Sequence, residues 1–151
     1  FFKTTFANYE LIASENDRVF NYENRIYRPF MTDQLLLKQL MTILFDNAIK
    51  YTEEDGEIEF VVYATDRHLY LTVTDNGIGI SAADKKKIFD RFYRVDKART
   101  RQKGGFGLGL SLAKQIVDAL RGTISVKDNK PRGTIFEVKI AIQSPPKRKN
   151  K

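Results

Sequence analysis

The amino-acid sequence predicts one globular domain of the α+β class, for three reasons. Stretches with helical apolar spacing alternate with pairs of stretches in which every second residue is apolar, as in half-buried strands. The 151 residues, 42% of them hydrophobic, can bury one core and would be cramped as two domains. No run is long and apolar enough to cross a bilayer, so we expect a soluble chain, and its start at Phe1 suggests a piece of a longer protein.

Charge and residue types narrow the classes of function. The formal net charge is +7, from 26 Lys and Arg against 19 Asp and Glu. This balance favours an anionic partner, which can be a nucleotide phosphate, a nucleic acid or an acidic protein face. The chain has no cysteine, so disulfide frameworks and cysteine-ligated zinc sites are excluded.

The first third of the chain predicts two helices separated by two short strands. Aromatic residues at helical spacing predict an amphipathic helix over residues 3–13. Imperfect alternation predicts strands over residues 18–22 and 25–28. A long helix without Gly or Pro is then expected from Thr32, as its N-cap, to Tyr51.

The middle of the chain predicts a strand pair and a short helix. Residues 57–64 and 69–74 alternate between apolar and polar, and the Asp-Gly dipeptide at 55–56 is typical of hairpins. A Ser-x-x-Asp capping box then predicts a helix over residues 81–92.

The end of the chain predicts a helix, a second strand pair and a tail. The helix is expected over residues 109–120, with Gly122 as its C-cap. Strands are expected over residues 123–127 and 134–142. Residues 144–151 contain two prolines and four basic residues, and we expect a disordered tail there.

A first candidate site is the DNGIGI stretch that begins at Asp75, directly after an alternating strand. Gly77 and Gly79 let the backbone turn sharply and approach a ligand without a Cβ in the way. A carboxylate repels phosphate but accepts hydrogen bonds, so Asp75 suits the exocyclic amine of adenine. The alternative is an ordinary Asx turn closing a hairpin.

A second candidate site is a polar stripe on the long helix. Asn47, Lys50 and Tyr51 lie three and four positions apart, so they share one side of that helix. An amide oxygen can ligate Mg²⁺ and an ammonium can meet phosphate, so the stripe suits a magnesium nucleotide. The alternative is a solvated helix end.

His68, which is the only histidine, has no ligand partners in the sequence and is expected to be an exposed residue.

A third candidate site is the segment between residues 95 and 110. Its charged part is expected to be a mobile lid that folds over phosphate, or simply a solvated loop. It ends in GGFGLGL directly before a helix, where free backbone N–H groups and the helix dipole favour an anion. A glycine hinge without a ligand is the alternative.

Taken together, four motifs in this order resemble the N, G1, F and G2 boxes of sensor histidine kinases. They are NAIKY from Asn47 to Tyr51, DNGIGI from Asp75 to Ile80, IFDRFYR from Ile88 to Arg94, and GFGLGL from Gly105 to Leu110. The resemblance implies the catalytic ATP-binding domain over residues 1–143: a two-layer α/β sandwich of the Bergerat type, with a mixed sheet, about three helices and a mobile ATP lid. The F box separates the chain from gyrase, Hsp90 and MutL, which share this fold.

The resemblance also implies roles for residues. Asp75 would bind the adenine amine, Asn47 would hold Mg²⁺, Lys50 and Arg94 would neutralise phosphate, and Thr134 would support Asp75. The implied catalytic residues are Asn47, Lys50 and Arg94. The implied ATP-binding residues are Asn47, Lys50, Tyr51, Asp75, Gly77, Gly79, Ile80, Tyr93, Arg94, Lys103, Gly105, Gly107, Leu108, Gly109, Leu110 and Thr134.

Two departures from the family bear on activity. Ile43 stands where the family commonly has a second Asn, so a non-catalytic nucleotide-sensing module is one alternative. His68 is followed by Leu69 and does not match the family's phosphoacceptor, so the acceptor is expected on a separate helical dimerisation domain. A nucleic-acid-binding module, suggested by the charge, is ranked last and no nucleic acid is expected.

The resemblance implies partners and a location as well. These are ATP, the helical dimerisation and phosphoacceptor domain, and a response regulator. The fragment is expected to be monomeric, whereas the full-length protein is expected to be a homodimer. We expect a cytoplasmic domain of a membrane-anchored sensor.

Overall fold

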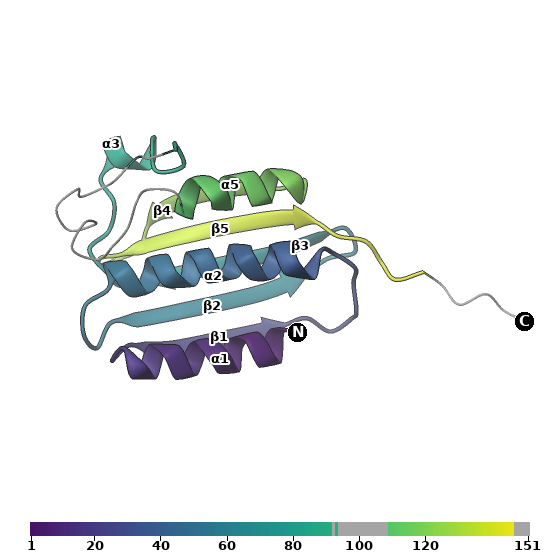
Figure 1. Cartoon of the computed structure of the whole chain (residues 1–151), viewed down its shortest axis with the longest axis horizontal. Helices are drawn as coiled ribbons and strands as arrows, with labels where there is room; N and C mark the ends of the chain where they lie inside the picture. The colour runs from purple at the N-terminus through teal and green to yellow at the C-terminus, as the bar shows by residue number, and fades with distance from the viewer. Residues whose placement is uncertain (92, 94–108, 147–151) are drawn as a thin grey trace, which may run out of the picture.

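A five-stranded mixed sheet with three long helices on one face forms a two-layer α/β sandwich, as expected (Figure 1). The computed structural model describes residues 1–91, 93 and 109–146. The strand order is β1-β2-β3-β5-β4, and only the β1–β2 pair is parallel. In chain order the elements are α1 (Phe2–Glu15), β1 (Val19–Arg25), α2 (Gln34–Tyr51), β2 (Glu57–Ala64), β3 (His68–Asp75), α3 (Ala82–Lys85), α5 (Gly109–Ala119), β4 (Thr123–Asp128) and β5 (Thr134–Ala141).

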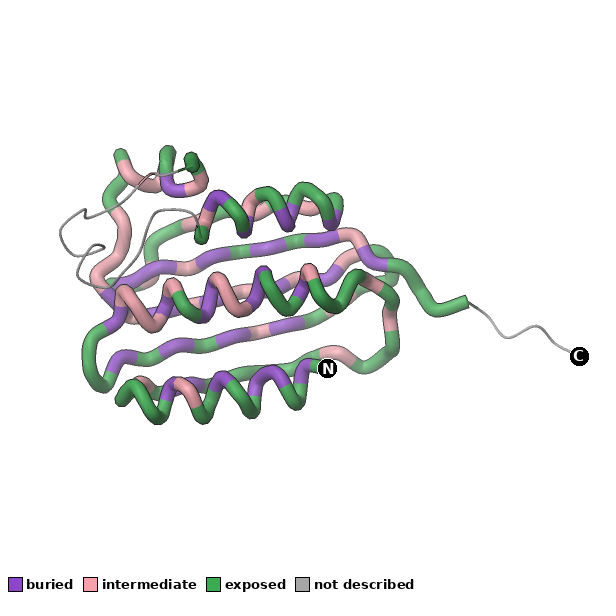
Figure 2. The backbone as a smooth tube through the Cα atoms, in the orientation of Figure 1, coloured by how far each residue is buried: buried purple, intermediate pink, exposed green. Residues whose placement is uncertain are grey.

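The core lies between the sheet and the helices. Buried and more exposed residues alternate along the central strands, so within the described residues the helices cover one face of the sheet (Figure 2). The helix α1 packs on β1, and α5 packs on α2 and β4. Among the residues described, no helix is long and apolar enough to span a membrane.

Aromatic side chains fill the part of the core beneath α1. Phe6, Phe20, Phe45 and Phe60 are buried there around Tyr9, and we call these five residues the aromatic cluster. The rings of Tyr9 and Phe45 stack with centroids 4.3 Å apart. The Tyr9 hydroxyl forms a 2.7 Å hydrogen bond with Thr42 Oγ1, and burial raises the pKa of Tyr9 to about 12.

The predicted strand pair at residues 18–22 and 25–28 is wrong. The structure has one strand, β1, which pairs in parallel with β2 through Arg25 opposite Tyr63. The chain turns only after this pairing ends, where Asn24 Oδ1 accepts a hydrogen bond from the Ile26 N–H. The alternation was imperfect because most β1 residues are exposed at the sheet edge.

The ends of two predicted helices also differ. The N-cap of α2 is Asp33 rather than Thr32, since its carboxylate accepts from the Leu36 N–H at 3.0 Å. The helix predicted over residues 81–92 begins at the expected Ser81 cap but ends at Lys85. Turns follow and place the buried Ile88 against the core, so tertiary packing replaces the helical repeat there. Residue 92 lies outside the described residues.

Two glycines have roles other than those predicted. Gly122 is not the left-handed residue that ends α5, because that conformation belongs to Arg121, with φ of 57°. The Gly122 N–H instead bonds Val117 O, and a Cβ at Gly122 would lie 2.1 Å from Lys139 O. Gly56 joins α2 to β2 and therefore lies in no hairpin.

The C-terminal boundary stays a prediction. Gln143, the last residue of the predicted domain, forms an isolated bridge with Met31. Of the predicted tail, residues 147–151 lie outside the described part of the chain.

Candidate functional site

Asp75 is a buried carboxylate at the end of β3, with 3% of the residue exposed. Its Oδ1 accepts a 2.8 Å hydrogen bond from the Gly77 N–H. Burial raises the pKa of Asp75 to about 6, although hydrogen bonds from the backbone of Gly77 and Thr134 oppose that rise. Asp75 is therefore an acceptor held in place, and it is mostly ionised at neutral pH.

Residues 76–79 form the loop after Asp75, which we call the G1 loop, and it lies on the C-terminal end of α2. The Ile78 N–H donates to Tyr51 O at 3.0 Å. A Cβ at Gly77 would stand 2.0 Å from the same carbonyl oxygen, so only glycine fits there. The predicted stripe of Asn47, Lys50 and Tyr51 thus belongs to the helix end on which the G1 loop packs.

The start of β5 closes the opposite side of the G1 loop. Thr134 is buried and pairs directly with Asp75 across the β3–β5 ladder. Gly133 has φ of +112°, and a Cβ on it would stand 1.9 Å from Asp75 O. Gly79, with φ of +77°, approaches Gly133 O. Glycine is therefore required at residue 133 for the close approach of backbones beside Asp75, and it is favoured at residue 79 by the positive φ.

The first turn of α5 meets α2 beside the polar stripe. A Cβ at Gly109 would lie 3.7 Å from Ile43 Cγ2, so Ile43 lies beside the helix start that was predicted to receive an anion. Ile43 is half-buried and lies one helical turn before Asn47. The structure therefore puts a methyl group where the resemblance led us to expect a second amide.

The structure brings together many of the predicted residues. The end of α2, the G1 loop, Thr134 and the start of α5 form one end of the sandwich, near α3 in Figure 1. Asn47, Lys50, Tyr51, Ile80 and Leu110 are half-buried there. Five predicted residues lie outside the described part of the chain: Arg94, Lys103, Gly105, Gly107 and Leu108.

Tyr93 is the last described residue before residues 94–108. Its hydroxyl donates a hydrogen bond to Asp84 on α3, which lowers the pKa of that carboxyl. Asp84 also accepts from Ser81 Oγ. The end of the predicted F box is thus tied back to α3 by a side chain.

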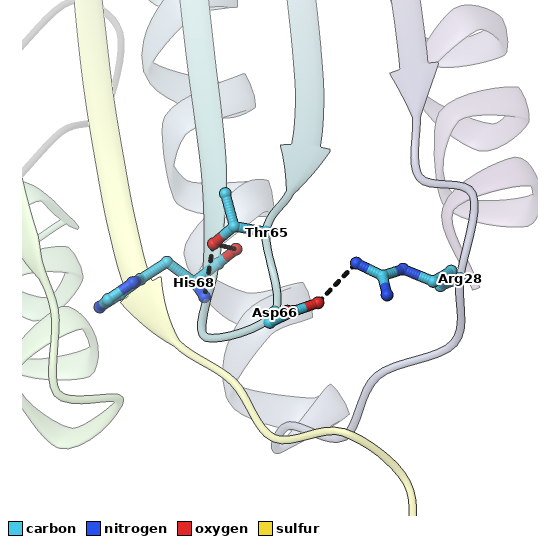
Figure 3. Close-up of polar contacts among 4 residues, drawn as sticks. All are labelled: Arg28, Thr65, Asp66 and His68. Carbon is cyan, nitrogen blue, oxygen red and sulfur yellow. Dashed lines mark hydrogen bonds and ion pairs between the residues drawn. The ribbon is translucent and has the colours of Figure 1, made fainter.

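His68 lies at the other end of β3, about 23 Å from Asp75 for a strand of this length. Its backbone N–H donates to Thr65 Oγ1 at 3.2 Å and closes the β2–β3 hairpin, while its ring points away from that turn (Figure 3). Beside it, Arg28 pairs with Asp66 at 2.5 Å between exposed side chains. His68 is half-buried and not exposed as predicted, and its backbone N–H has a structural role in the hairpin.

The residues at this site can be compared with those that Mg²⁺ and a nucleotide require. Among the residues described, no three His, Cys, Asp or Glu side chains gather as a metal cluster. A single amide such as Asn47 suits Mg²⁺, which takes few protein ligands and several oxygens from water and substrate phosphates. Asp75 and the glycine-containing G1 loop, in turn, offer a buried acceptor next to half-buried backbone.

Two side chains at this site were not foreseen from the sequence. Asn129 and Arg132, in the turn between β4 and β5, donate hydrogen bonds to Asp75 O and Gly77 O. They stand 54 and 55 positions from their partners, and no periodicity or local motif links such distant residues. The only available signal was that the turn precedes Thr134.

Comparison with known proteins identifies the family to which the chain is similar. A family model described as "Histidine kinase-, DNA gyrase B-, and HSP90-like ATPase" matches residues 32–144. The chain is 82% identical over 149 residues to the sensor protein CiaH of Streptococcus pneumoniae, covering 99% of this chain and 34% of that protein. It therefore spans about a third of the length of that curated relative.

Solved structures agree on the fold. The mycobacterial sensor histidine kinase MprB matches with a TM-score of 0.75 and 25% identity, over 95% of this chain and 94% of that one. The histidine kinase ThkA, solved in complex with the response regulator protein TrrA, matches with a TM-score of 0.73 and 24% identity, over 93% and 39% of the two chains.

Proposed function

The chain belongs to the histidine kinase-, DNA gyrase B- and HSP90-like ATPase family, and on that premise we propose that it binds Mg-ATP and donates the γ-phosphoryl group to a histidine on a separate helical domain. The buried Asp75 carboxylate at the glycine loop is the observation that carries this proposal. Its neighbours in the fold, on α2 and at the start of α5, supply groups suited to phosphate.

Base recognition follows from the protonation state of Asp75. One carboxylate oxygen accepts from the Gly77 N–H, and the ionised group retains further acceptor capacity for the exocyclic amine of adenine. Guanine presents a carbonyl oxygen at the corresponding ring position, so two acceptors would face each other there. Asp75 therefore selects adenine through both attraction and repulsion.

Phosphate recognition rests on α2 and α5. Lys50 supplies a positive charge, and the N-terminus of α5, which begins at Gly109, favours an anion through the helix dipole. Asn47 would hold Mg²⁺, which when bound neutralises charge between the phosphates. Arg94, which lies outside the described residues, is proposed to neutralise phosphate charge from the F box. The chemistry then depends on positioning and charge neutralisation.

The environment of Ile43 favours a second candidate function, a nucleotide-sensing module with little transferase activity. Ile43 lies beside the start of α5, and its methyl group can bind neither metal nor a catalytic water. The change Ile43→Asn would restore an amide one turn from Asn47. A large gain in phosphoryl transfer at unchanged ATP affinity would favour the sensing module.

The partners follow from the same proposal. The phosphoacceptor histidine is expected on a dimerisation domain of the same sensor, and a response regulator is expected to receive the phosphoryl group. ThkA, whose fold matches, has been solved with such a regulator. We propose that this chain is the cytoplasmic part of a membrane-anchored, homodimeric sensor.

Phosphoryl transfer in trans tests the proposal. The chain is mixed with the isolated acceptor domain of the same sensor and ATP labelled on its γ-phosphate, and acid-labile, base-stable label on the acceptor is measured. We expect phosphohistidine with the wild-type chain and none with Asp75→Asn. ATP binding without any transfer by the wild type would reject the transferase function and leave the sensing module.

A further inference from the structure

The turn between β4 and β5, residues 129–133, is hydrogen-bonded to the G1 loop through two side chains. Asn129 Nδ2 donates to Asp75 O at 2.9 Å, and Arg132 Nε donates to Gly77 O at 2.8 Å. These two carbonyls lie on either side of Asn76, so the turn holds the backbone on which the Asp75 carboxylate depends. We call this turn the clamp turn.

The clamp turn is itself held at several points. The Asn129 N–H donates to Gly133 O at 3.0 Å, and Asn129 Oδ1 accepts from the Lys130 N–H at 2.9 Å. At its start, Asp128 forms a 2.7 Å ion pair with Lys85 of α3. A turn closed by its own hydrogen bonds and tied to a neighbouring element can restrain the loop against which it packs.

The restraint reaches the Asp75 side chain through Gly77. The Gly77 N–H is the donor that orients Asp75 Oδ1, and Arg132 binds the carbonyl of the same residue. On the other side of the loop, Asn76 Oδ1 accepts from the Glu57 N–H at 2.8 Å. A shift of Gly77 would therefore rotate the carboxylate away from any base in front of it.

We propose that Asn129 and Arg132 are positioning residues that hold the Asp75 carboxylate in the orientation that distinguishes adenine from guanine. This inference rests on the proposed nucleotide binding and adds a specificity-determining element to it. Neither residue touches the base in this account, since both act through the G1 loop. The exposed Arg132 has a competing interpretation, in which its positive charge simply attracts phosphate.

Two substitutions at Arg132 separate positioning from charge, and a third substitution removes the other donor to the G1 loop. Asn129→Asp keeps the acceptor for the Lys130 N–H, removes the donor to Asp75 O and adds a negative charge. Arg132→Ala removes both the hydrogen bond and the charge, whereas Arg132→Gln removes the charge and keeps an N–H donor. The matched control is Lys130→Ala, which removes a positive charge from the same turn at an exposed side chain.

Calorimetric affinities for Mg-ATP, Mg-GTP and magnesium tripolyphosphate form the first readout. We expect Asn129→Asp and Arg132→Ala to bind Mg-ATP about tenfold more weakly, as for the loss of one hydrogen bond to the loop. The affinities for Mg-GTP and tripolyphosphate should not fall, and Arg132→Gln should recover most of the loss. Equal losses for ATP and tripolyphosphate, or no loss at all, would overturn the proposal.

Amide hydrogen exchange without nucleotide is the second readout, because it does not depend on ATP binding. Exchange of the Gly77 and Ile78 amides should rise several-fold in Asn129→Asp and Arg132→Ala, with no change in Lys130→Ala or in the central strands. Unchanged exchange would overturn the clamp. If exchange rises as expected but the wild-type chain binds no ATP, the clamp is supported and the proposed function fails.

Discussion

The aromatic cluster and the surroundings of Asp75 are both closely packed, but different chemical groups fill them. In the cluster, large rings fill the space between α1, α2 and the sheet, and Phe6, Phe45 and Phe60 are fully buried. Around Asp75, backbones approach one another because Gly77 and Gly133 have no side chains, and the buried group is an ionisable acid. The comparison teaches that side-chain volume supports stability in one region, whereas the other keeps a charge at a cost in stability, and we propose that this charge serves nucleotide binding.

The largest expected effect is on stability and belongs to the cluster. Phe60 has its ring centroid 5.6 Å from those of both Tyr9 and Phe20. Phe60→Ala should lower the free energy of unfolding by about 3–5 kcal/mol, measured by urea denaturation, because it removes apolar area and leaves a cavity. The folded fraction should bind Mg-ATP as the wild type does. A loss below about 1 kcal/mol, or specific loss of ATP binding, would break the distinction between the two regions.

The next effect is an increase in the free energy of unfolding, and it is expected when the charge of Asp75 is removed. Burial raises the pKa of Asp75 from its ordinary value of 3.8 to about 6 in the folded chain, so folding disfavours the ionised form. Stability from this group is therefore fully present below about pH 4 and is lost as pH rises through 6. At pH 8 the ionised form costs on the order of 1–3 kcal/mol.

The variant Asp75→Asn should accordingly be more stable than the wild type at pH 8, with a gain that shrinks towards pH 4. Urea denaturation at the two pH values measures this difference. A variant that is less stable at pH 8 would contradict the view that Asp75 is retained for binding at a cost in stability.

A smaller effect is expected at Arg18, which links the two regions. Arg18 precedes β1, yet its Nη2 donates to Thr52 O at 2.6 Å and to Ile49 O at 3.2 Å, where α2 ends. Arg18→Ala should lower the free energy of unfolding by about 1–2 kcal/mol and weaken ATP binding by about twofold, since it uncaps the helix that carries Tyr51. Denaturation and calorimetry check both values, with Arg18→Lys as a partial rescue. Normal stability would show that the carbonyls are satisfied without Arg18.

The smallest effect is a dependence of ATP affinity on pH. Because the carboxylate must be ionised to accept from adenine, lowering the pH from 8 to 6 should weaken Mg-ATP binding about twofold, and by about tenfold near pH 5. Phosphate groups also titrate near pH 6, so the affinity for magnesium tripolyphosphate is measured alongside and subtracted. An ATP affinity that follows tripolyphosphate at every pH would remove Asp75 from base recognition.

Local patterns predicted much of this structure, and nonlocal contacts explain where they did not. Asp75, Gly77 and Gly79 could be recognised because a strand end, a carboxylate and two glycines are adjacent in the chain. The helix predicted to residue 92 ends at Lys85 because Ile88 is drawn to the core, which a capping box cannot foretell. The hydrogen bonds of Asn129 and Arg132 join a turn and a loop that meet only in the folded chain.

The parallel pairing of β1 shows the same limit. Nothing in residues 18–28 specifies β2 as a partner, because the pairing joins segments separated by all of α2. The first predicted strand, residues 18–22, lies mostly within β1, whereas of the second, residues 25–28, only Arg25 belongs to that strand. Asp33 was missed as the cap of α2 because Thr32, its neighbour, has an equally suitable side chain.

The most direct test of the central claim is a calorimetric titration of Mg-ATP into the wild-type chain and into Asp75→Asn. In the variant, the single amide oxygen is taken by the Gly77 N–H, so an NH₂ group faces the amine of adenine and two donors oppose each other. We expect the wild type to bind Mg-ATP and the variant to bind at least about thirtyfold more weakly, as for loss of a hydrogen bond to a charged group. Equal affinity in the two proteins would contradict an adenine site built on Asp75.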